Sequence, residues 1–111
     1  MSIAEELTER IRGLVAFDPR VTEKRMFGGI CFLLDGKILV AARRTGTLMA
    51  QIGAEAMAEV RDEPGVAPMM MRGKPTAAFV DVEAAELLDD EEALQRWVDM
   101  ATRYVAAKPG K

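Results

Sequence analysis

The chain has 111 residues, half of them hydrophobic and 30% charged, which predicts one globular domain rather than a disordered segment. Its net charge of −3 argues against broad, non-specific attraction to nucleic acid. It has no long apolar run, no signal peptide and only one cysteine, so we expect a cytoplasmic protein with no membrane span and no internal disulfide.

The first expected element is a helix that begins with a capping box. Ser2 is placed to be its N-cap, and Glu5 stands three residues later. Apolar residues then recur at helical spacing from Ile3 to Val15. Asp18-Pro19 should end this helix, because a residue that precedes proline is pushed out of the helical region.

Four strands are expected next, over residues 21–27, 30–34, 37–43 and 48–52. Asp35-Gly36 is a strong signal for a type I′ hairpin between the second and the third. These two strands are apolar on both faces, whereas a sheet covered on one side should alternate. Either both faces are covered within the domain, or one face is buried in a partner or in a second copy. The last of these alternatives predicts a homodimer.

The second half of the chain predicts a short helix over residues 55–61 and strands over 69–71 and 76–82. A Gly73-Lys74-Pro75 turn should join these strands, and Asp89 should cap the final helix, with Glu92 closing a second capping box. Consecutive hairpins flanked by helices predict an α+β fold. We expect two layers over residues 1–111: an antiparallel sheet of about five or six strands, with N- and C-terminal helices packed on it.

The residue types argue against catalysis. The chain has no histidine, which removes the commonest general base and metal ligand. Cys31 lies in an apolar strand, where a buried, inert thiol is expected. Gly28-Gly29 lacks the third glycine of a dinucleotide site. We therefore expect no catalytic residue, no metal and no cofactor.

Two clusters have a functional and a structural interpretation. The acidic run 89–92 could bind a metal, but acids in the first turn of a helix are also favoured by its dipole. The methionines 69–71 could form a thioether site, but alternation along a strand would separate their sulfurs. We prefer the structural interpretation of both, with the methionines filling a core or an interface.

Basic residues are concentrated in the middle of the chain. Residues 18–53 carry a net charge of +3, whereas residues 1–17 carry −1 and residues 54–111 carry −5. If the strands are neighbours, several basic side chains could form a patch for phosphate, nucleic acid or an acidic protein. Otherwise they are solvated strand ends, some paired with the acidic final helix. The candidate binding residues are Lys24, Arg25, Lys37, Arg43, Arg44, Arg72 and Lys74.

The segment Arg25-Met26-Phe27-Gly28-Gly29, followed by Phe32 and Gly36-Lys37, resembles the motif of the TfoX/Sxy N-terminal domain family. The closing pattern of Leu94, Trp97-Val98 and Ala101 continues the resemblance, which covers nearly all of the chain. It implies a small α+β domain without known catalytic residues. It also implies a stand-alone form that lacks the C-terminal domain of bacterial competence regulators, which work with other transcription factors.

The motif has a physical interpretation of its own. Phe27 should anchor the core, and Gly28 and Gly29 permit positive φ, a bulge or the close passage of another backbone. We expect a structural corner built from Met26, Phe27, Gly28, Gly29 and Gly36. The alternative is a ligand-facing loop flanked by Arg25.

The sequence as a whole predicts a non-catalytic regulatory or protein-binding module with an unidentified protein partner. The alternative is a nucleic-acid or phosphate-binding domain that uses the basic residues of the first three strands.

Overall fold

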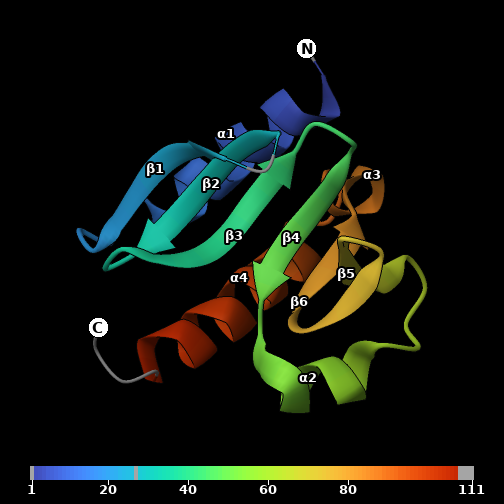
Figure 1. Cartoon of the computed structure of the whole chain (residues 1–111). Helices are drawn as coiled ribbons and strands as arrows, with labels where there is room; N and C mark the ends of the chain where they lie inside the picture. The colour runs from blue at the N-terminus through green and yellow to red at the C-terminus, as the bar shows by residue number, and fades with distance from the viewer. Residues whose placement is uncertain (1, 27, 108–111) are drawn as a thin grey trace.

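Six strands form one antiparallel sheet in the computed structural model, which describes residues 2–26 and 28–107 (Figure 1). The expected α+β class and strand number are confirmed. In chain order the elements are α1 (Ile3–Val15), β1 (Val21–Met26), β2 (Gly29–Leu34), β3 (Lys37–Arg43), β4 (Thr47–Gln51), α2 (Gly53–Val60), β5 (Val66–Met71), β6 (Lys74–Glu83), α3 (Ala84–Leu87) and α4 (Glu91–Ala107).

The strands lie in the order β1-β2-β3-β4-β6-β5, so only the last two depart from chain order. The Asp35-Gly36 turn has φ values of 52° and 82°, which confirms the expected hairpin type. The second hairpin turns at Arg72-Gly73, with φ values of 55° and 79°. The turn was therefore predicted too late in the chain, at Gly73-Lys74-Pro75, because Lys74 and Pro75 already belong to β6.

The main core lies between the sheet and the helices. Figure 1 shows α1 and α4 behind the same face of the sheet. Side chains from all four helices and from β2, β3, β4 and β6 share this core, because each of these elements directs some of its apolar residues to that side. On the surface, Arg12 of α1 donates to both carboxylate oxygens of Glu23 in β1, at 2.6 and 2.7 Å.

The N-cap predicted from the sequence is correct for α1 and wrong for α4. The capping box of α1 is confirmed: the Glu5 backbone N–H donates to Ser2 Oγ at 3.1 Å, and the Ser2 N–H donates to Glu5 Oε1 at 3.0 Å. For α4 the prediction was wrong, because Asp90 rather than Asp89 accepts the bond from the Ala93 N–H, at 3.1 Å. Glu92 is then one position too early to close a box.

Other boundaries also differ. The second helix begins two residues earlier than expected, at Gly53, and β5 begins at Val66. The four-residue helix α3 was not predicted. No helix within residues 2–26 and 28–107 is long and apolar enough to cross a membrane.

The other face of the sheet carries a second apolar cluster, formed by strand residues alone. Its centre, Cys31, Ala41, Met49 and Met69, is at most 3% exposed. The thiol is buried as expected, and burial raises the pKa of Cys31 to about 11. Met69 lies inside this cluster, whereas Met70 and Met71 are 54% and 45% exposed, so only one of the three methionines fills a core as expected. The sheet therefore shields much of this face with its own side chains, and the homodimer stays a prediction.

Candidate functional site

The family-like motif lies beside the start of α1 and lines a cavity of about 440 Å³, which we call the motif pocket. Ser2 and Thr8 of α1 line it, together with Gly28 and Gly29. Arg25 and Arg44 also line it, so two of the seven candidate basic residues meet here. Among the described residues, neither arginine side chain has a hydrogen-bond or ion-pair partner within the chain.

The glycines of the motif are needed by the backbone. Gly28 has a φ of 73°, a conformation that side chains disfavour. A Cβ atom on Gly29 would collide with the carbonyl oxygen of Ala42, so β2 and β3 can approach closely only with glycine here. The Arg44 N–H donates to the Gly28 carbonyl at 3.1 Å. Positive φ and close backbone passage were both expected. Phe27 lies outside the described residues.

The other candidate basic residues are dispersed. Lys24 pairs with Cys31 across β1 and β2, and Lys37 starts β3 at the end opposite Arg43. Arg72 and Lys74 lie at the β5–β6 hairpin, on the far side of the sheet from β1. The seven residues therefore do not form one continuous patch.

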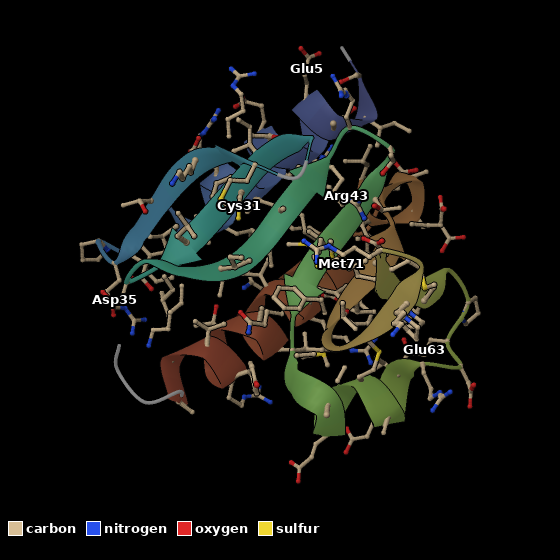
Figure 2. All side chains as sticks on the ribbon, viewed as in Figure 1. Glu5, Cys31, Asp35, Arg43, Glu63 and Met71 are labelled. Atoms are coloured by element: carbon tan, nitrogen blue, oxygen red, sulfur yellow. The ribbon has the colours of Figure 1, made fainter. Side chains whose placement is uncertain are left out.

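Arg43 belongs to an ion pair within the sheet. Its Nη1 lies 2.7 Å from Asp81 Oδ2, and Thr47 Oγ1 donates to the other carboxylate oxygen at 3.3 Å. Figure 2 shows Arg43 in front of the sheet, on the face turned away from α1 and α4. The expectation that some basic residues are paired is met, although the carboxylate comes from β6 and not from the final helix.

A larger cavity, of about 1150 Å³, lies between α2 and α4, and we call it the helical groove. It exists because α2 packs mainly on β6 whereas α4 packs on β3 and β4, so the two helices barely touch. Apolar residues form its floor: Ile52 and Val60 are buried, and Ala56, Met100 and Tyr104 pack partly exposed against the core.

The start of α2 fits closely against α4. Gly53 has a φ of 89°, and a Cβ atom there would overlap the Tyr104 ring. Glycine therefore permits both the turn into α2 and the contact that holds this end of the helical groove together.

The walls of the helical groove are mainly acidic. Five carboxylates line it against the two guanidinium groups of Arg96 and Arg103, which leaves a net charge of −3. These acids come from α2, from the loop that follows it, and from α4. They are Glu55, Glu59, Glu63, Glu92 and Asp99.

One ion pair crosses the helical groove. Arg96 of α4 donates to both carboxylate oxygens of Glu63, at 2.9 and 2.7 Å, and its guanidinium lies 4.9 Å from the centre of the Trp97 ring. Figure 2 shows Glu63 on the segment that follows α2. The hydrogen bonds from Arg96 hold the pKa of Glu63 below its ordinary value, so this carboxylate is ionised at neutral pH.

The helical groove was not predicted from the sequence. The like-charged pair Glu55 and Glu59, one helical turn apart, was the available signal, but the position of α4 beside it depends on the tertiary fold. Within residues 2–26 and 28–107, no group of three or more His, Cys, Asp or Glu side chains is placed to hold a metal ion. The arrangement offers apolar contact and negative charge.

Comparison with known families gives one match. The model of the TfoX N-terminal domain matches residues 14–104, from the end of α1 into the last turns of α4. Comparisons with curated proteins and with solved structures gave no match. The matched range contains the glycine motif, the whole sheet and every residue that lines the helical groove. The chain belongs to the TfoX N-terminal domain family.

Proposed function

We propose that the chain is a non-catalytic regulatory module that binds a segment of another protein in the helical groove. Membership in the TfoX N-terminal domain family supports a regulatory role, and within a bacterial cytoplasm it favours competence or transcription as the process. The observation that carries the proposal is the helical groove itself.

The residue chemistry supports binding rather than catalysis. The chain has no histidine, and the pKa of Cys31 is raised by burial, which disfavours a reactive thiolate at neutral pH. Glu63 has a lowered pKa, the opposite of what a carboxylic acid needs to donate a proton near neutrality.

The dimensions of the helical groove support a protein segment as its occupant. Its volume of about 1150 Å³ exceeds the common range for small-molecule pockets. Partly exposed apolar residues on its floor would gain stability by losing contact with water. The two helices that form its walls are fixed by the core, so the surface is largely formed before a partner arrives.

Ala56→Trp tests this proposal, because the indole would fill the floor of the helical groove. The matched control is Ala58→Trp, on the exposed side of α2 outside the groove. With circular dichroism confirming that both variants fold, each serves as bait in a native lysate. A captured protein is then purified and titrated by calorimetry.

The expected result is a protein that binds the wild type and Ala58→Trp but not Ala56→Trp. A captured protein that binds all three chains equally would assign binding to another surface and refute the proposal.

We propose phosphate binding at the motif pocket as the second candidate function. It is favoured by Arg25 and Arg44, which both line the motif pocket and whose guanidinium groups have no partner within the described chain. Binding to a labelled oligonucleotide or to inorganic phosphate should weaken as salt rises, and Arg25→Glu with Arg44→Glu should abolish it. Arg72→Glu with Lys74→Glu makes the same charge change elsewhere. No binding at low salt would eliminate this candidate.

A further inference from the structure

We infer that the segment bound in the helical groove is a basic amphipathic helix, with lysine or arginine on both sides of an apolar stripe. This inference rests on the proposed function and specifies the chemistry of the partner. Three features carry it: the helical walls, the apolar floor and two rows of carboxylates.

The walls favour a helix over an extended segment. Most backbone N–H and C=O groups of α2 and α4 are already bonded within their own helices, so the walls offer few partners for a backbone. An extended peptide would bury unpaired N–H and C=O groups against them. A helix satisfies its own backbone and can lay an apolar stripe on Ala56, Met100 and Tyr104.

The first row of carboxylates lies on α2. Glu55 and Glu59 are one turn apart, so they share a side of the helix and repel each other. The helix dipole favours Glu55 in the first turn but disfavours Glu59 in the last. Among the described residues, neither carboxylate has a hydrogen-bond or ion-pair partner. Helix stability therefore does not account for Glu59.

The second row lies on α4, where Glu92 and Asp99 are two turns apart. Glu92 is in the first turn, where the dipole favours an acid, but Asp99 lies in mid-helix and accepts one bond, from Gln95 Nε2 at 2.8 Å. Arg96 and Glu63 neutralise each other. The remaining four carboxylates face the apolar floor with only Arg103 to balance them.

Complementarity of charge then defines the partner. Cations spaced one turn apart would meet Glu55 and Glu59, and cations two turns apart on the other flank would meet Glu92 and Asp99. An acidic segment would add to the repulsion already present. A nucleic acid would meet the same repulsion.

Three synthetic peptides test the inference by calorimetry against the full chain. The first is a helix with a leucine stripe and lysine on both flanks. The second replaces each lysine with glutamate, and the third keeps the lysines but carries prolines that prevent a helix. We expect only the first to bind, and its affinity should fall as salt rises.

Two charge variants provide the matched comparison. Glu55→Gln with Glu59→Gln should weaken binding of the first peptide by about tenfold, as expected for losing two ion pairs at exposed carboxylates. Glu83→Gln with Glu86→Gln makes the same change at exposed sites outside the helical groove and should leave binding unchanged. These substitutions spare the core, so folding should persist.

The outcomes separate the inference from the proposed function. Binding of the acidic or the proline peptide as tightly as the first, with loss in Ala56→Trp, would keep the helical groove as a docking site and overturn the basic helix. Failure of all three peptides would also overturn the basic helix, and the captured-protein titration would then decide the proposed function. Equal effects of the two charge variants would overturn the inference as well.

Discussion

Gly29 illustrates at the scale of one residue how the motif forms a structural corner. Its missing side chain lets the backbone of β2 pass against the Ala42 carbonyl in β3. Gly13 offers the contrast, because nothing lies within 4 Å of a Cβ atom placed there. Close packing requires glycine at position 29, whereas position 13 has room for a side chain. The sequence alone does not distinguish these two cases.

Gly29→Ala should destabilise the fold by about 1–3 kcal/mol, because the added methyl group forces the two strands apart. Gly13→Ala should instead stabilise it by about 0.5–1 kcal/mol, because alanine is the better helix former. Urea unfolding of both variants measures the difference. Equal effects of the two substitutions would show that β2 and β3 can separate at no cost.

At the scale of elements, the start of α4 depends on one carboxylate. Asp90 Oδ1 accepts the bond from the Ala93 N–H, and Asp90 N–H itself donates to the Leu87 carbonyl at 3.2 Å. The acidic run 89–92 offered several possible caps. The turn that follows α3 places Asp90, rather than one of its neighbours, at the N-cap position.

Asp90→Ala should lower the free energy of unfolding by about 1 kcal/mol through loss of the cap. Asp89→Ala is the matched control and should have a smaller effect, because no bond from Asp89 to the helix is present. Thermal unfolding of the two variants tests this order. A larger loss for Asp89→Ala would mean that the helix begins one residue earlier in solution.

The elements that the sequence predicted best are those defined by neighbouring residues. The Ser2–Glu5 box and the Asp35-Gly36 turn depend on contacts within four residues, and both have the expected geometry. The first part of β5 was missed because Pro68 argues against a strand, which is tolerated here since β5 is an edge strand. Helix α3 is too short to show a periodic pattern.

At the scale of the whole molecule, the binding surfaces depend on contacts between distant segments. Several basic side chains were expected to form a patch if the strands are neighbours, and of the seven candidates Arg25 and Arg44 line the same pocket. Lys37 could already be separated from Arg44 by sequence, because the expected strand over residues 37–43 places it at the opposite end. Glu59 and Asp99 are 40 positions apart, and their shared groove depends on where α2 packs.

Stability should depend on pH through carboxylates whose pKa values are lowered in the folded chain. Bonds from the Ser2 backbone, Arg20, Arg12 and Arg96 lower the pKa values of Glu5, Asp18, Glu23 and Glu63 respectively. The folded chain thus binds fewer protons than the unfolded chain on the acid side. This stabilisation is complete above the ordinary glutamate pKa of 4.5 and is lost as pH falls through the folded values.

The urea concentration at the unfolding midpoint should therefore decrease as the pH is lowered from about 6 to about 3. Glu63→Gln should reduce this fall, because it removes the ion pair with Arg96, whereas Glu86→Gln removes no ion pair among the described residues. Unfolding curves at each pH provide the measurement. A midpoint independent of pH would show that these ion pairs contribute nothing to stability.

Trp97 is the only tryptophan in the chain, so its intrinsic emission reports on one location. Arg96, which is stacked on its ring, also holds Glu63 across the helical groove. A partner that draws Glu63 or Arg96 away would change the polarity around the indole. The emission maximum should then follow occupancy of the helical groove without an attached dye, which gives a direct screen for partners of this family.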